Sequence, residues 1–192
     1  MPDPNPAAMD FMLSRRSRPA KTLQGPVPSR DELEPLLTAA ARTPDHGKLE
    51  PWRFIVLQGK AMDRLATLAQ ARGAQLGYDE EKTTKGAAQF VTGELVVVVV
   101  EVQKPSEKVP AIEQTYSAGA VCLALLNAAL ASGWGANWLS GWPSHDREFI
   151  EAGFGLGPHE SVAGIIHIGT EKMAPPERPR PDLSAITTWV DA

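Results

Sequence analysis

The sequence predicts an α+β domain in which helices cover a small sheet. Three observations predict this class: segments with apolar residues at helical spacing, a run of β-branched residues over 95–100, and a long, almost wholly apolar segment after that run. Continuous β-branched runs are typical of buried strands, and a helix without a polar face lies centrally or against a partner chain. At 192 residues, the chain is expected to form a single domain over 1–192.

In the first half of the chain, capping and helix-breaking residues mark the elements. Ser29 and Glu32 have capping-box spacing, so a helix is expected to begin there, and Pro35 is expected to bend its second turn. Residues 1–9 are expected to form a disordered tail, because proline occupies alternate positions at its start. The expected elements are helices over residues 10–16, 30–42 and 62–75 and a strand over 51–57.

In the second half, the strand over 95–100 is the clearest element. The polar segment 77–89 before it is expected to be either a mobile loop that covers a site or a surface helix. Small residues recur in the apolar segment 115–132, which predicts a central helix or one that packs against a partner chain. The remaining expected elements are a strand over 133–138, a glycine-rich turn within 149–157, a strand over 162–168 and a proline-rich tail.

Composition narrows the function classes. The chain has 19 Lys and Arg against 23 Asp and Glu, a net charge of -4, which argues against a general nucleic-acid-binding protein. Its one cysteine, Cys122, excludes an internal disulfide and fits a reducing compartment. The sequence shows no targeting signal and no apolar run that indicates a membrane span. We therefore expect a cytoplasmic protein without a membrane or nucleic-acid partner.

Motifs of several enzyme classes are missing from the sequence. There is no P-loop, and the glycines at 153, 155 and 157 fail the dinucleotide fingerprint because Pro158 stands where its next glycine is required. There is no nucleophile elbow of a serine hydrolase. The four histidines show no metal-ligand spacing. We expect no metal site, and the residues reveal no catalytic acid–base set.

Two arginine clusters lie near opposite ends of the chain, Arg15-Arg16-Ser17-Arg18 and the pair Arg178 and Arg180. They are either solvated surface or a phosphate clamp. Guanidinium groups bind phosphate oxygens bidentately, and the Ser17 hydroxyl adds a donor. The prolines beside Arg178 and Arg180 stiffen that segment, which lowers the entropy lost on ordering around an anion.

Two further groups are candidates for ligand binding. Arg42, His46 and Lys48 are expected to come together where a helix ends, a Gly/Pro turn follows and a strand begins, although this segment could equally be a decorated loop. The second group is rich in tryptophan, which indicates a planar binding site, a subunit interface or a filled core. Its members are Trp134, Asn137, Trp138, Ser140 and Trp142.

Taken in sequence order, these groups resemble the motifs of the nitroreductase family of FMN-dependent oxidoreductases, especially its short, single-domain bacterial members. Arg15-Arg16-Ser17 is similar to the family's N-terminal phosphate-binding motif, and residues 43–52 resemble its helix-to-strand motif. The helix over 116–131 with residues 133–141 is similar to the family's central helix and the strand beside the flavin. Gly169-Thr170 with residues 178–181 is similar to its closing motif, so the resemblance covers almost the whole chain.

The resemblance implies a central, mostly antiparallel sheet flanked by helices, in a homodimer whose subunits exchange segments and share two FMN sites. It implies hydride transfer from NAD(P)H through flavin N5 to a nitroaromatic, quinone or similar electron-poor small molecule, by a ping-pong mechanism. No catalytic side chain is implied, because the flavin carries the chemistry. The alternative is a flavin-binding or interaction protein with little turnover.

The resemblance also implies which residues bind the cofactor. Arg15, Arg16 and Ser17 would hold phosphate and ribityl oxygens. Arg42 and His46 would reach the flavin bound mainly to the other subunit. Lys48 departs from the family pattern, which usually has Asn there, and our hypothesis is that a lysine near the ring stabilises anionic reduced flavin. The remaining implied contacts are Trp138, Leu139 and Ser140 along the isoalloxazine and Arg178 and Arg180 at the phosphate.

Overall fold

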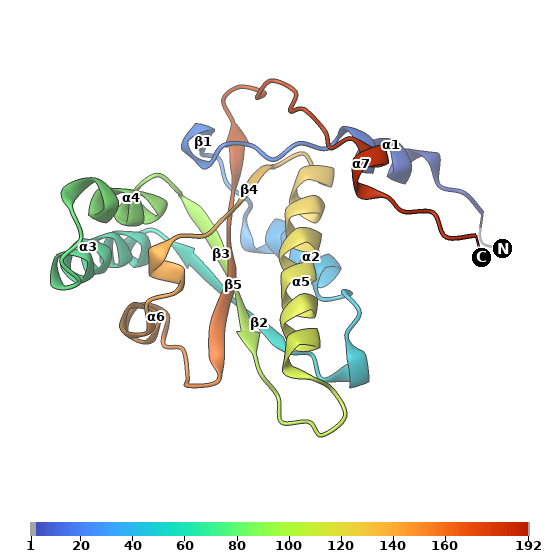
Figure 1. Cartoon of the computed structure of the whole chain (residues 1–192). Coiled ribbons are helices and arrows are strands. Elements are labelled where there is room, and N and C mark those ends of the chain that lie inside the picture. The colour runs from blue at the N-terminus through green and yellow to red at the C-terminus, as the bar shows by residue number, and fades with distance from the viewer. Residues whose placement is uncertain (1–2, 192) are drawn as a thin grey trace.

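A computed structural model describes residues 3–191, and its five strands form one sheet. The sheet follows the order β1-β5-β3-β2, with β4 also paired to β5, and every pairing is antiparallel. The predicted α+β class with an antiparallel sheet is therefore confirmed (Figure 1). The strands are β1 (Leu23–Gln24), β2 (Trp52–Gln58), β3 (Leu95–Val102), β4 (Gly135–Leu139) and β5 (Glu160–Glu171).

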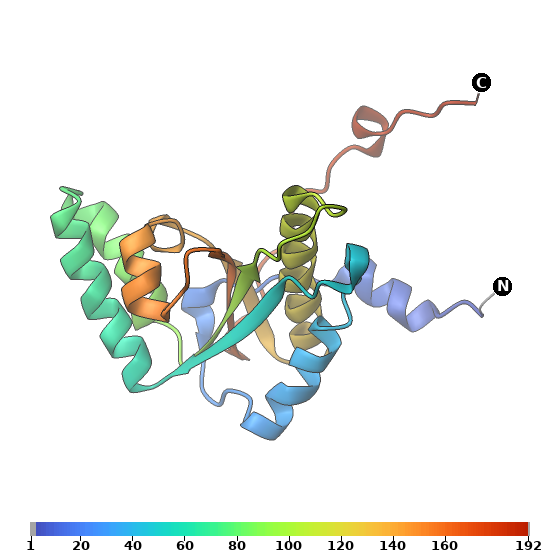
Figure 2. The same cartoon turned by 90° about the horizontal axis from the view of Figure 1, so that it is seen from below.

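Helices cover both faces of this sheet. Figure 2 shows α3, α4 and α6 on one side of the strands and α2 and α5 on the other. The helices are α1 (Pro6–Ser14), α2 (Arg30–Ala40), α3 (Lys60–Gln75), α4 (Glu80–Val91), α5 (Ala111–Ala131), α6 (Arg147–Phe154) and α7 (Leu183–Ile186). Short 3-10 turns are η1 (Ala20–Thr22), η2 (His46–Lys48) and η3 (Trp142–Ser144).

Strand β3 divides the core into two halves, as its unbroken apolar run predicts. Val96, Val98 and Val100 belong to the apolar cluster with residues of α3, α4 and α6. The intervening residues Leu95 and Val97 belong to the cluster with α2 and α5. Because side chains of a strand alternate between its faces, a strand buried on both faces carries no polar alternation.

The expected capping box is present at the start of α2. The Ser29 hydroxyl accepts from the Glu32 backbone N–H, and the Glu32 carboxylate accepts from the Ser29 N–H. Pro35 lies inside this helix.

Several boundaries differ from the expectations. Helix α1 begins at Pro6, because the Asn5 side chain caps it by accepting from Ala8. Residues 6–9 are therefore helical rather than part of a disordered tail, and residues 1 and 2 of that tail lie outside the described residues. The segment 77–89 contributes to α4, as in the surface-helix alternative. Residues 149–154, expected within a glycine-rich turn, belong to α6, and Gly155 ends that helix in the left-handed conformation.

Among the described residues, α5 is the one helix long and apolar enough to be a candidate membrane span by length and composition. The core helix of a folded domain passes the same test. Helix α5 packs against α2, β3, β4 and β5 and buries Val121, Cys122 and Leu125. This packing accounts for its apolar inner face, whereas its opposite face carries the exposed side chains of Tyr116 and Leu123.

Candidate functional site

The first arginine cluster lies where α1 ends and the chain runs along β4. The backbone N–H of Arg18 donates to the Ala136 carbonyl at 2.8 Å, and the Asn137 side chain donates to the Arg18 carbonyl at 2.6 Å. The guanidinium of Arg15 donates to the Ser17 hydroxyl at 3.0 Å. These bonds fix the cluster at the edge of the sheet beside a cavity of about 290 Å³, here called the arginine cavity, which Arg15, Arg16 and Arg18 help to line.

The arginine cavity carries more positive than negative charge, because its three arginines face one acidic residue among the described residues that line it, Glu171, which pairs with Arg18. Partial burial, followed by the positive charges of Arg180 and Arg16, lowers the pKa of the Arg15 guanidinium. The Nε atoms of Arg15 and Arg16 are buried and have no hydrogen-bond partner within residues 3–191. A buried donor without a partner costs roughly 1–3 kcal/mol, and an anion would supply acceptors for such donors. The cavity therefore has the chemistry of a phosphate site.

In the second arginine cluster, Arg180 is the residue that acts on the arginine cavity. Arg180 acts on the pKa of Arg15 and forms an ion pair with Glu177 at 2.7 Å. A backbone hydrogen bond from Arg178, and then the charges of Arg180 and Arg16, lower the pKa of Glu177. The structure thus places Arg180 within electrostatic range of Arg15, across most of the sequence. Arg178 lies in the same exposed segment, and only its backbone is placed at Glu177.

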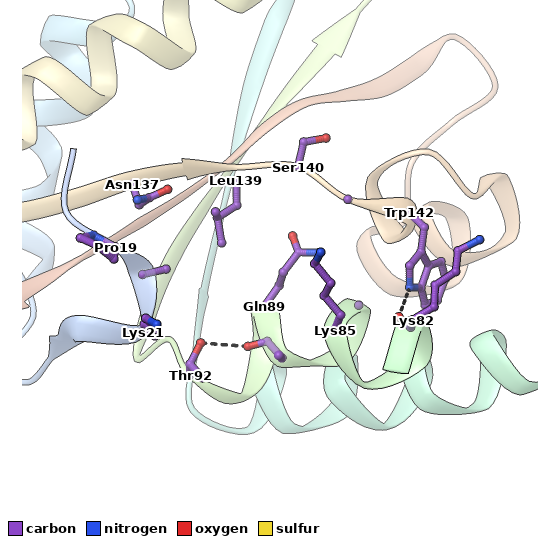
Figure 3. Close-up of a pocket in the computed structure, with 14 residues that line it drawn as sticks. Pro19, Lys21, Lys82, Lys85, Gln89, Thr92, Asn137, Leu139, Ser140 and Trp142 are labelled. Carbon is purple, nitrogen blue, oxygen red and sulfur yellow. Dashed lines mark hydrogen bonds between the residues drawn. The ribbon is translucent and has the colours of Figure 1, made fainter. Parts of the chain in front are cut away.

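Residues 15–21 connect the arginine cavity to a larger one, of about 700 Å³, between η1, β4 and α4. This second cavity is called the α4 pocket and is shown in Figure 3. Gly135 lines the arginine cavity and Ser140 lines the α4 pocket. At a rise of about 3.3 Å per strand residue, these positions are roughly 16 Å apart. The two cavities therefore lie beside the two ends of β4, and this pair of cavities is called the track: its first end is cationic and its second is more apolar.

Strand alternation decides which β4 residues face the α4 pocket. Asn137 and Leu139 line it, followed by Ser140, whose hydroxyl lies 3.1 Å from Nε2 of His145. Trp138 points to the other face, where a Cβ on Gly164 would overlap its indole ring. Of the three residues expected along a flavin ring, Leu139 and Ser140 line this pocket, with the Leu139 side chain pointing toward α4 and that of Ser140 away from it (Figure 3), and Trp138 lies outside it.

Trp142 forms a fixed wall of the α4 pocket. Its indole N–H donates to the Lys82 carbonyl at 3.2 Å, and its ring makes edge contacts with Tyr78 and Phe149. A Cβ added to Gly86 would lie 2.0 Å from the Trp142 Nε1. Glycine at position 86 is therefore what lets the edge of the indole approach α4 so closely.

Five polar residues of the α4 pocket were not singled out in the sequence: Lys21, Lys82, Lys85, Gln89 and Thr92. Gln89 is only 8% exposed, and its Oε1 is buried without a partner in the described part of the chain. Figure 3 shows Gln89 and Lys85 rising from α4 toward Leu139 and Ser140. The signal that could have found them is helical spacing, because positions 82, 85 and 89 lie on one face of a helix.

The group around His46 lies elsewhere in the protomer. The His46 Nδ1 is 2.6 Å from a carboxylate oxygen of Glu113, in the first turn of α5. Leu130, near the other end of α5, lines the arginine cavity. Seventeen residues at about 1.5 Å each separate these positions by roughly 26 Å. Arg42, His46 and Lys48 are exposed, and within one chain they do not reach the track.

The turn that carries His46 and Lys48 is held in an uncommon conformation. Gly47, Lys48 and Glu50 all have positive φ angles, of 76°, 55° and 48°. The Asp45 carboxylate accepts from the backbone N–H groups of Leu49 and Glu50. Residues other than glycine rarely adopt positive φ angles, and residues that do so cluster at functional sites.

Comparison with known proteins identifies the family. Residues 12–170 match the family model described as "Nitroreductase family". "Putative NAD(P)H nitroreductase YdjA" of Escherichia coli (strain K12) is 31% identical over 166 residues, which are 86% of this chain and 89% of that protein. The chain belongs to the nitroreductase family, as its motifs predicted.

Solved structures share the fold. A nitroreductase-like family protein from Bacillus cereus matches with a TM-score of 0.81 at 24% identity, covering 100% of both chains. A Desulfovibrio desulfuricans protein, solved in complex with FMN, matches with a TM-score of 0.74 at 20% identity, covering 98% of each chain.

Proposed function

We propose that this protein is an FMN-dependent oxidoreductase that uses NAD(P)H to reduce nitroaromatics, quinones or similar electron-poor small molecules. The observation that carries the proposal is the track along β4, in which a cavity with buried, unpartnered arginine donors lies at one end and a larger pocket at the other. The family supports it, and so does the relative named as an NAD(P)H nitroreductase.

The residues of the track fit FMN in three respects. Arg15, Arg16 and Arg180 would hold the phosphate, with the Ser17 hydroxyl as a further donor. The backbone along Arg18 and β4 would flank the rest of the molecule. The buried amide of Gln89 needs a polar partner, and the isoalloxazine edge offers both carbonyl and N–H groups. Leu139 and Ser140 would lie beside that ring.

When bound, FMN supplies reversible two-electron hydride chemistry. The protein would provide orientation and a controlled environment. Trp142 and Leu139 would limit water at one side of the α4 pocket, and Lys85 would place a positive charge beside it. Since NAD(P)H and the acceptor would use the same pocket in turn, we expect ping-pong kinetics. NAD(P)H is abundant in the cytoplasm, which is the location we propose.

We further propose that the working unit is a homodimer. The exposed face of α5 carries Ile112, Tyr116 and Leu123, and the C-terminal segment exposes Trp189 and Val190. Exposed apolar groups of this extent mark an interaction surface. A second subunit would also explain the group around His46, because it could bring Arg42, His46 and Lys48 to the track of its partner, as the family resemblance implies.

Two measurements test these proposals. Titration of the purified protein with FMN should give one flavin per chain. A protein that cannot be loaded with FMN would refute the proposed FMN-dependent activity. Sedimentation should show a dimer that Leu123→Glu dissociates, whereas Val91→Glu, at another exposed apolar residue outside α5, should not. A wild-type monomer, or equal effects of both variants, would rule out this interface.

A further inference from the structure

The α4 pocket has a charge balance opposite to that of the whole protein. The chain carries a net charge of -4, but the described residues that line this pocket include three lysines and neither aspartate nor glutamate. Lys21 comes from η1, and Lys82 and Lys85 come from α4. A hollow lined by one sign of charge raises the local concentration of ions of the opposite sign.

These lysines are not neutralised by the protein. None of the ion pairs found among residues 3–191 includes Lys21, Lys82 or Lys85. The Lys82 ammonium lies 3.3 Å from the centre of the Tyr78 ring, which holds it by a cation–π contact at the pocket rim. Lys21 and Lys85 lie on opposing elements, so their charges remain available to a ligand between them.

The other lining groups favour a flat, apolar ligand body. Trp142 presents a ring fixed by a hydrogen bond and two edge contacts, and Leu139 and Ala88 add apolar surface. The volume of about 700 Å³ would be shared between the isoalloxazine ring of the proposed function and the acceptor that lies beside it. An apolar wall with a few cationic groups is complementary to an aromatic molecule that bears a negative group.

We propose that the α4 pocket selects electron acceptors that carry a negative charge, and that Lys21 and Lys85 recognise a carboxylate on an electron-poor aromatic ring. This inference rests on the proposed function, because it names the class of molecule that the enzyme reduces. The chemistry of a lysine pair would also suit the additional phosphate of NADPH, so the experiment separates the two sources of negative charge.

The test compares benzoate with benzamide, which have nearly the same size and differ by one unit of charge. Calorimetric titration of the FMN-loaded protein should show benzoate binding about tenfold more tightly at low salt, as expected for charge-assisted hydrogen bonds. This preference should shrink at high salt. It should also fall by about threefold or more in Lys21→Gln and in Lys85→Gln. Lys60→Gln, at the exposed start of α3, is the matched control and should keep it.

Two outcomes would overturn the proposal. Equal affinities for benzoate and benzamide in the FMN-loaded wild type would exclude charge selection and leave the proposed flavin chemistry intact. Variants that keep the benzoate preference but lose affinity for NADPH relative to NADH would assign the lysines to the dinucleotide. If Lys85→Gln does not retain FMN, then Lys21→Gln and the salt dependence of the wild type still decide the question. A protein that binds no FMN at all would instead refute the proposed function itself.

Discussion

Replacing Arg15 by glutamine should weaken binding of FMN while leaving binding of riboflavin, which lacks the phosphate, unchanged. Arg15 lies in the arginine cavity, and its buried Nε has no partner among the described residues. A hydrogen bond to a charged group contributes roughly 1.5–3 kcal/mol. Because Arg15 is only partly buried, we take the lower half of that range, which corresponds to an increase in Kd of about 10- to 40-fold.

The assay is fluorescence titration of protein without flavin, with FMN and riboflavin in parallel. Arg30→Gln, on the exposed first turn of α2, serves as a control and should change neither Kd. The interpretation of the arginine cavity as a phosphate site would be refuted if Arg15→Gln weakened both flavins equally or weakened neither.

Thermal stability provides a second, independent test of the Arg15→Gln variant. Burial and neighbouring positive charges lower the pKa of Arg15, so its charge is less favourable in the folded protein than in the unfolded chain. Removing that charge should leave the Tm of the flavin-free protein unchanged or slightly higher. The increase in Tm that FMN produces should become smaller. A Tm several degrees lower without FMN would instead show that Arg15 mainly supports the fold.

Three further predictions concern stability. Gly86→Ala should force Trp142 to move and cost about 1–3 kcal/mol, which lowers the Tm by about 3–10 °C; an unchanged Tm in a thermal melt would show that the indole moves freely. Burial lowers the pKa of His167 to about 4 from 6.5, so its contribution to stability is complete above pH 6.5 and is lost as the pH falls toward 4. In His167→Gln, the midpoint of urea unfolding should therefore vary less with pH over that range, and a pH dependence equal to that of the wild type would contradict this. Ser29→Ala removes the capping bond to Glu32 and should cost about 1 kcal/mol, whereas Thr38→Ala, at an exposed position in the same helix, should cost less.

The sequence predicted the elements whose residues follow simple physical rules. The unbroken β-branched run of β3 and the capping box of α2 each specify one structure, because few alternatives satisfy their burial and hydrogen bonds. Helix α4 was ambiguous for a physical reason. Its buried positions are filled by Thr83, Gly86 and Gln89 as well as Phe90, so they do not produce an apolar periodicity.

The candidate site was predictable only in part, because it depends on long-range placement. Strand alternation separates Trp138 from Leu139, but the sequence alone does not say which face of β4 meets the pocket. The approach of Arg180 to Arg15 was expected from the family resemblance, and the structure supports it. The distance of His46 from the track follows from the length of α5, so the role of that group depends on the proposed dimer.

The most direct test of the proposed function is anaerobic titration of the FMN-loaded protein with NADH and with NADPH, monitored by flavin absorbance. We predict that at least one of them bleaches the flavin in a stoichiometric reaction, and that a nitroaromatic or quinone then restores the absorbance. Flavin that neither nucleotide reduces would contradict the proposal and identify the chain as a flavin-binding protein with little turnover.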